Sequence, residues 1–143
     1  MRIVIFVLML IVSIKGISQG VFNENIQKAL TKLSNKKANF VVTNPVRFTD
    51  SSGKVISFKR IVELEDGYMR RISKRYGKSL IPYLVKMFDD SKRDWAANLL
   101  LYAVTESSAV VLRYYSVDKI EEWRQVQKQS DKEKWENYLR SMQ

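Results

Sequence analysis

The first pattern in the chain is an apolar run at its N-terminus. A positively charged start precedes twelve residues, Ile3 to Ile14, that are almost all apolar, and Lys15 ends the run. A membrane-spanning helix needs about 20 such residues, whereas the apolar core of a secretory signal peptide needs about 7 to 15. The pattern therefore predicts a signal peptide over residues 1–18, cleaved after Ser18, with cleavage after Gln19 or Gly20 as close alternatives. A buried strand or helix of a cytosolic domain and an uncleaved membrane anchor are the alternatives.

Beyond this run, apolar residues recur mostly at the intervals of three and four that indicate amphipathic helices. One such face spans Val21 to Leu33, and another spans Tyr68 to Tyr76, where Gly77 follows as a favourable C-terminal cap. A chain of this length makes one hydrophobic core. We therefore expect a mainly α fold, in which residues 19–143 form a single compact multi-helix domain.

The segment over residues 40–57 departs from the helical pattern. Asn44 precedes a proline, which disfavours helix, and the run from Asp50 to Gly53 is a strong turn signal. The flanking runs Phe40 to Val42 and Lys54 to Ile56 favour strands. We expect an irregular segment with at most two short strands, or a short hairpin, and helices from Ser57 onward.

Two adjacent helices with a short polar turn between them are predicted over Leu80 to Val104. Ser79 is the expected N-cap of the first helix, and Pro82 falls in its first turn, where a missing N–H breaks no helical hydrogen bond. Asp89 and Asp90 are expected to end this helix and to cap the next. Short connections of this kind make the two helices antiparallel neighbours.

The same stretch resembles one HEAT-type repeat. The resemblance rests on these residues: Leu80-Ile81-Pro82, Leu84, Asp89-Asp90, Ala96-Ala97 and Leu100. It implies that a first helix with an early proline meets, through an acidic turn, a second helix whose alanines allow close packing. Arg93-Asp94-Trp95 departs from the Val-Arg pair usual in the family. No second copy follows at a similar spacing, so one such hairpin within a compact domain is expected rather than a solenoid.

The last two helices are predicted from capping boxes. Residues 118–121 (DKIE) and 130–133 (SDKE) each place a side-chain acceptor three residues before a glutamate, the spacing of a reciprocal cap. Apolar faces follow each box. We expect the three tryptophans of the chain, each within an apolar stripe, to lie in the core or to dock helices: Trp95, Trp123 and Trp135.

Composition excludes much chemistry. The chain has no cysteine and no histidine, so disulfides, thiolate nucleophiles, Cys/His zinc sites and imidazole bases are absent. No glycine-rich phosphate loop or nucleophile elbow occurs. We expect no cofactor, no metal and no enzymatic activity. The remaining catalytic hypothesis is a hydrolase whose acids lie among Asp89, Asp90 and Asp94.

The chain is strongly basic, with a net charge of +10, and loss of Arg2 and Lys15 with the signal peptide leaves 23 basic and 15 acidic residues, or +8. In an exported protein this charge indicates an anionic envelope component, an acidic protein or simple solubility, and no nucleic-acid partner is expected. The charge is concentrated on one predicted helical face, which we call the basic ridge: Arg70, Arg71, Lys74, Arg75 and Lys78.

The basic ridge is a candidate partner-binding or anion-binding surface, and a face that is merely solvated is the alternative. Arg93 and Asp94, expected near the exposed start of a helix, are further candidates for partner contact.

Together, these patterns predict a small exported helical module that binds another protein, in the periplasm or outside the cell, without stable membrane insertion after cleavage. By analogy of size and architecture, it could be a bacterial immunity protein that blocks a toxin or an envelope adaptor. The alternative is an anion-binding envelope protein that uses the basic ridge.

Overall fold

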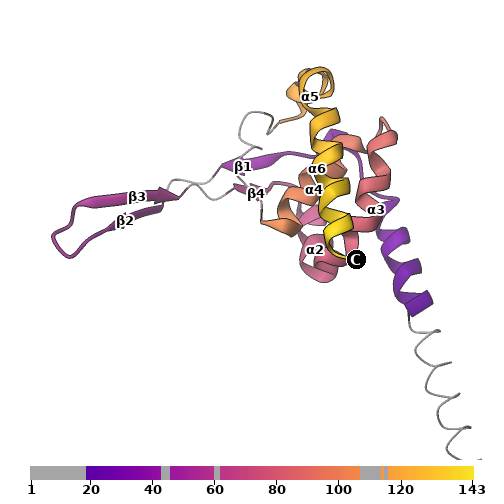
Figure 1. Cartoon of the computed structure of the whole chain (residues 1–143), viewed down its shortest axis with the longest axis horizontal. Helices are drawn as coiled ribbons and strands as arrows, with labels where there is room; N and C mark the ends of the chain where they lie inside the picture. Colours follow the sequence, from indigo (N-terminus) through magenta and orange to yellow (C-terminus); the bar gives the residue numbers. More distant parts are fainter. Residues whose placement is uncertain (1–18, 43–45, 60–61, 107–113, 115) are drawn as a thin grey trace, which may run out of the picture. The chain divides into compact units, whose positions relative to one another are not determined.

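The structure is a computed structural model of the chain, and it describes residues 19–42, 46–59, 62–106, 114 and 116–143 (Figure 1). The predicted signal peptide over residues 1–18 lies outside the described residues. The chain divides into two compact units, Met1–Lys32 and Leu33–Gln143. In the first unit, residues 19–30 are helical, which confirms the helix expected from the apolar spacing after Val21.

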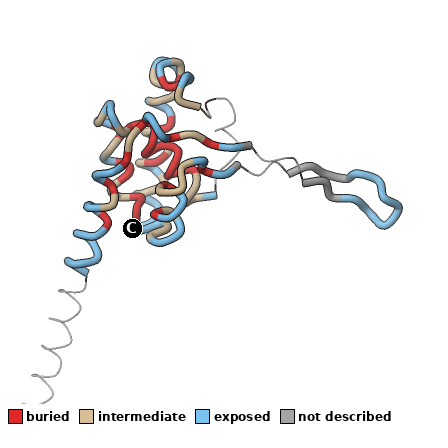
Figure 2. The backbone as a smooth tube through the Cα atoms, turned by 180° about the vertical axis from the view of Figure 1, so that it is seen from behind, coloured by how far each residue is buried: buried red, intermediate tan, exposed pale blue. Residues whose placement is uncertain are grey.

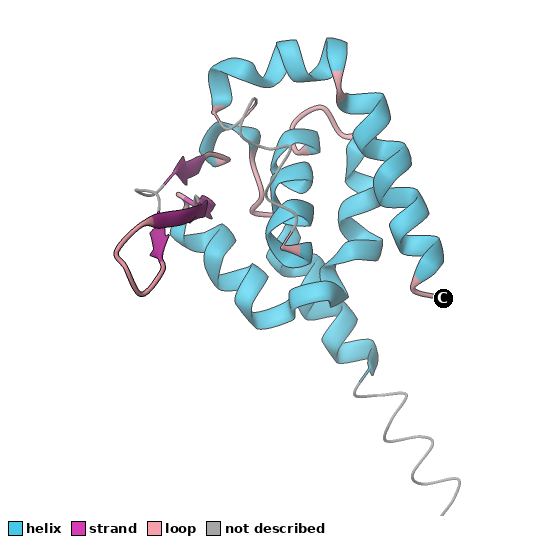
Figure 3. Ribbon diagram, turned by 60° about the vertical axis from the view of Figure 1, so that its left-hand side comes forward, coloured by secondary structure: helices cyan, strands magenta, loops and turns pink. Residues whose placement is uncertain are grey.

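The second unit is mainly α, as the sequence predicts (Figure 3). The helix α3 packs against α4, as expected for two neighbouring helices. The resemblance of this pair to a HEAT repeat stays a prediction. The helices and 3-10 turns of this unit are η1 (Asn35–Lys37), α2 (Gly67–Tyr76), η2 (Gly77–Leu80), α3 (Ile81–Lys86), η3 (Met87–Asp89), α4 (Asp94–Thr105), η5 (Val117–Lys119), α5 (Ile120–Val126) and α6 (Lys128–Ser141).

Four short strands form two antiparallel pairs between η1 and α2. The strand β1 (Phe40–Val42) pairs with β4 (Val62–Leu64), and β2 (Val46–Thr49) pairs with β3 (Val55–Lys59). The expectation of at most two strands, with helix from Ser57 onward, is therefore wrong. β-branched and aromatic residues favour strands, and here each strand finds a partner that supplies its backbone hydrogen bonds.

The predicted turn at Asp50 is confirmed and joins β2 to β3. One carboxylate oxygen of Asp50 accepts hydrogen bonds from the backbone N–H groups of Ser52 and Lys54, at 2.9 and 3.0 Å. Gly53 has a φ of +81°, a conformation that glycine adopts without steric cost. The β-prone run at residues 40–42, however, pairs across the sheet with β4 and not with the strand after the turn.

Helix α4 is the centre of the core of the second unit (Figure 2). Every residue from Asp94 to Tyr102 is buried, so this helix has no exposed face over two and a half turns. Ala96 and Ala97 are both fully buried, which allows neighbouring helices to approach closely. The sequence predicts an amphipathic stripe here; the structure instead shows a helix covered on all sides, in the manner of a core helix.

Helix termini follow the sequence signals only in part. Gly77 ends α2 with a φ of +50°, as predicted. At the other end, Asp66, which was not predicted as a cap, accepts from the N–H of Met69 at 2.9 Å. By contrast, Ser79 does not cap α3, which follows η2 directly. Pro82 does lie in the first turn of α3.

The two predicted capping boxes near the C-terminus do not form. Asp118 lies within η5, and Ser130 lies inside α6 because that helix begins two residues earlier, at Lys128. Among the described residues, none of the helices has the length and apolarity needed to cross a bilayer.

Candidate functional site

The basic ridge lies on α2 and continues onto η2, and all five of its side chains are exposed. Met69 and Ile72, on the opposite side of α2, are buried and anchor the helix to the core. Lys74 and Arg75 stand in the last turn, where positive charge also stabilises the helix dipole. The ridge is therefore a positive surface on a helix that has a cap at each end and on the 3-10 turn that follows it.

Carboxylates do not neutralise this surface. No acidic residue occurs between Asp66 and Asp89. Within the part of the chain that the structure describes, none of the five ridge side chains forms an ion pair with a carboxylate. Elsewhere, cations such as Lys28, Lys119 and Lys132 do pair with acids. The ridge thus keeps its charge available to an external anion.

Two tyrosines border the ridge. The sequence had placed these tyrosines on the apolar side of α2. Tyr68 and Tyr76 are half-buried, and each contacts a ridge arginine. The guanidinium carbon of Arg71 lies 5.8 Å from the ring centre of Tyr68, and that of Arg75 lies 5.3 Å from the ring centre of Tyr76. Both distances are within the range of cation–π attraction, so the rings help to position the arginines.

The other two candidate residues, Arg93 and Asp94, do not form an exposed contact surface. Arg93 is half-buried and donates from Nε to Asp90 at 2.6 Å. Asp94 is 0% exposed, so the expectation that it lies at the exposed start of a helix is wrong. The physical reason is that cations from α5 and α6 cover the start of α4 and compensate the buried charge.

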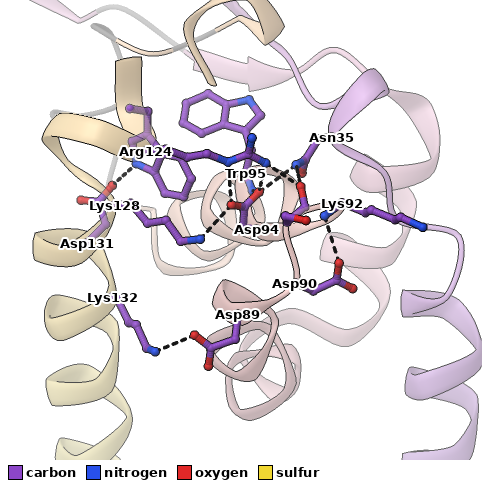
Figure 4. A network of polar contacts seen from close by, with 12 residues as sticks. Asn35, Asp89, Asp90, Lys92, Asp94, Trp95, Arg124, Lys128, Asp131 and Lys132 are labelled. Carbon is purple, nitrogen blue, oxygen red and sulfur yellow. Dashed lines mark hydrogen bonds and ion pairs between the residues drawn. The ribbon is translucent and has the colours of Figure 1, made fainter. Parts of the chain in front are cut away.

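Asp94 is the centre of a polar network (Figure 4). Its Oδ2 accepts from Arg124 Nε at 2.9 Å and from Lys128 Nζ at 3.0 Å. Its Oδ1 accepts from Arg124 Nη2 at 2.9 Å, from Asn35 Nδ2 at 2.8 Å and from the Trp95 N–H at 2.8 Å. Burial alone would raise the pKa of Asp94, but these hydrogen bonds outweigh it and hold the pKa below its usual value.

A second buried carboxylate, Asp131 of α6, continues the network along α4. Asp94, Asn98 and Tyr102 follow one another at intervals of four residues, which places them on one side of α4. Asp131 accepts from Asn98 Nδ2 at 3.1 Å, from Tyr102 Oη at 3.0 Å and from Trp123 Nε1 at 2.7 Å. Burial and the charge of Asp131 raise the pKa of Tyr102, so its hydroxyl remains a donor.

The three tryptophans lie in the core, as predicted, and their indole N–H groups are all hydrogen bonded. Trp95 donates to the carbonyl of Ala38 at 3.0 Å, and Trp135 donates to Asn98 Oδ1 at 3.0 Å. Trp123 donates to Asp131, as described above. These rings hold α4, α5 and α6 together and present no platform to a ligand.

The aspartates of the turn before α4 have structural partners. Asp90 accepts from the N–H of Lys92 at 2.9 Å, in addition to Arg93. It follows the last residue of η3, as predicted, but the expectation that it caps the next helix is wrong, because α4 has Arg93 at its N-cap and no side-chain cap hydrogen bond. These hydrogen bonds lower the pKa of Asp90. Asp89 pairs with Lys132 at 2.8 Å, and that hydrogen bond lowers the pKa of Asp89. In the described ranges, no three carboxylates converge as a metal ion requires.

Sequence reasoning missed the network around Asp94 and Asp131. The available signal was the four-residue spacing of Asp94, Asn98 and Tyr102 inside an otherwise apolar helix, because polar groups on a buried helix need partners. The identity of those partners, Arg124 and Lys128, could not be read from the same stretch. They come from helices about 30 residues further along the chain.

Comparison with known proteins gives no relative: the chain matches no protein-family model, no curated protein and no solved structure.

Proposed function

We propose that this chain is an exported, non-catalytic helical module that binds another protein through the basic ridge of α2. The observation that carries the proposal is the set of five exposed cations that have no carboxylate partner among the described residues. Arginine and tyrosine are also the residue types enriched at the energetic centres of protein interfaces, and here Arg71 and Arg75 lie against tyrosine rings.

The buried aspartates support a binding role over hydrolysis. A carboxylate hydrolase needs acids that reach a substrate, whereas Asp94 and Asp131 are buried and saturated with donors from the protein itself. Asp89 and Asp90 are held by Lys132 and Arg93. An immunity protein that blocks a toxin and an adaptor of envelope machinery are the two biological roles that fit a small exported binding module.

The second candidate function is binding of an anionic envelope component, such as a polysaccharide, through the same ridge. The observation that favours it is again the uncompensated charge of α2. The two functions differ in salt dependence, because binding that depends mainly on charge weakens steeply as ions screen it. A protein interface with well-packed contacts keeps more of its affinity when the salt concentration is raised.

The test is a pull-down from the envelope fraction of the producing organism with the mature chain as bait. The ridge variant Arg71→Glu with Arg75→Glu should lose the copurifying protein. Lys36→Glu with Lys37→Glu, a matched pair of charge reversals on exposed η1 residues, should retain it. Equal capture by both variants and the wild type would show that the ridge does not bind the partner.

A further inference from the structure

Four cations of the basic ridge form two parallel rows on α2. Arg70 and Lys74 make one row, and Arg71 and Arg75 make the other, each with a spacing of four residues. Lys78 lies beyond Gly77, on η2. With a rise of about 1.5 Å per residue, successive cations of a row lie roughly 6 Å apart along the helix axis. An α-helix with acidic residues at every fourth position presents carboxylates at the same interval.

Side chains spaced four residues apart also form the ridges through which helices pack against each other. The commonest helix–helix contact in globular proteins places the i±4 ridge of one helix in the groove between two i±4 ridges of its neighbour. The row of Arg70 and the row of Arg71 flank such a groove on α2. An extended acidic segment has no i±4 ridge, so the geometry favours a helical partner.

The tyrosines argue against a single-stranded nucleic acid as the ligand. Nucleobases bind by stacking on exposed aromatic faces. Here, the ring of Tyr68 is approached by Arg71 and the ring of Tyr76 by Arg75, at 5.8 and 5.3 Å, and both rings are half-buried. These contacts instead hold two guanidinium groups in place, and a guanidinium can bind a carboxylate with two hydrogen bonds.

A membrane surface fits α2 poorly. An interfacial helix inserts an apolar face between lipid headgroups. The apolar side chains of α2, Met69 and Ile72, are buried in the protein and unavailable for insertion. The exposed side of α2 offers cations bordered by two half-buried tyrosines, which suits a charged protein surface.

We infer that the basic ridge receives an acidic α-helix of the partner protein, whose carboxylates recur every four residues along one face. This inference rests on the proposed protein-binding function and specifies the chemistry of its partner. Each ridge row would face a line of carboxylates, with Arg71 and Arg75 providing the most directional contacts because their positions are set by the adjacent tyrosines.

The experiment uses designed peptides of about 16 residues, a length at which alanine-rich helices begin to be stable. The first peptide carries glutamates at every fourth position, and the second has the same composition with the glutamates distributed around the helix. A third repeats the first with a central proline that prevents helix formation. Heparin and phosphatidylglycerol vesicles serve as the other anionic probes. Binding to the mature chain is measured by fluorescence anisotropy, and helicity by circular dichroism.

We expect the first peptide to bind at least about tenfold more tightly than the second and third, as expected for matched charges. Arg71→Gln with Arg75→Gln should remove this preference, and Lys36→Gln with Lys37→Gln should not. Equal affinity for the three peptides, or tighter binding to heparin or vesicles, would overturn the acidic-helix inference. The pull-down tests the proposed function independently of the peptides. That function stands if the ridge variant loses the copurifying protein, and it fails if the variant retains the protein.

Discussion

At the scale of single residues, Asp94 is a side chain on which many polar contacts converge. It is fully buried, yet it receives hydrogen bonds from four residues of η1, α4, α5 and α6. A buried charge is costly unless it is paired and hydrogen bonded, and Arg124 and Lys128 provide both. Asp94 therefore links η1, α4, α5 and α6, so that the position of each element depends on the others.

We predict that Asp94→Ala destabilises the protein by about 3 kcal/mol. This is the lower end of the range for breaking a buried ion pair, since Arg124 and Lys128 keep partial access to water. Urea unfolding at neutral pH measures the change. Asp89→Ala is the matched control: it removes a carboxylate that is 76% exposed in its ion pair with Lys132, so the free energy of unfolding should hardly change. Equal losses in the two variants would contradict the role assigned to Asp94.

The pKa of Asp94 also predicts a pH dependence. Because the pKa is lower in the folded protein than in the unfolded chain, the stabilisation is present above the unfolded value of about 4 and is lost as the pH falls through the folded value. Thermal unfolding from pH 6 down to about pH 2 should therefore show a steeper decline for the wild type than for Asp94→Asn. Parallel curves for the two proteins would argue against this linkage.

At the scale of elements, the sequence predicts helices better than strands. The face of α2 follows from local spacing, and its C-terminal cap signal at Gly77 is local too. The pairing of β1 with β4 joins segments about 20 residues apart, which no local pattern specifies. The ridge was predictable because its residues are close together in the sequence, on α2 and the 3-10 turn that follows it. The network of Asp94 was not predictable, because its partners lie on other helices.

Gly77 provides a test of how α2 ends. Its φ of +50° strains any residue with a Cβ, although a Cβ there would meet no atom within 4 Å. Gly77→Ala should therefore cost about 1–2 kcal/mol through backbone strain alone. Gly67→Ala, at the other end of α2, is the control, since its φ is not positive and its Cβ would meet only the flexible end of Arg70 at 3.9 Å. Thermal denaturation of both variants measures the loss of stability. A smaller loss of stability for Gly77→Ala than for Gly67→Ala would contradict the expected backbone strain.

At the scale of the whole molecule, the proposed function depends on export. We predict that the protein in the envelope or medium begins at Gln19, after removal of residues 1–18. N-terminal sequencing and intact mass measure this directly. Leu8→Arg places a charge within the apolar run and should leave the uncleaved precursor in the cytoplasm, whereas Lys15→Arg should not alter processing. An intact N-terminus on the wild-type protein would contradict the predicted signal peptide.

The network of Asp94 has a consequence for the order in which the chain can fold. Its compensating cations, Arg124 and Lys128, are synthesised 30 and 34 residues after it. Trp123 and Trp135, which are fully buried, also come late. A nascent chain that ends before these residues would have to bury an uncompensated carboxylate beside an incomplete core. We expect such a chain to remain unfolded until synthesis is almost complete, and an unfolded chain is the form that can be threaded through a narrow translocation channel.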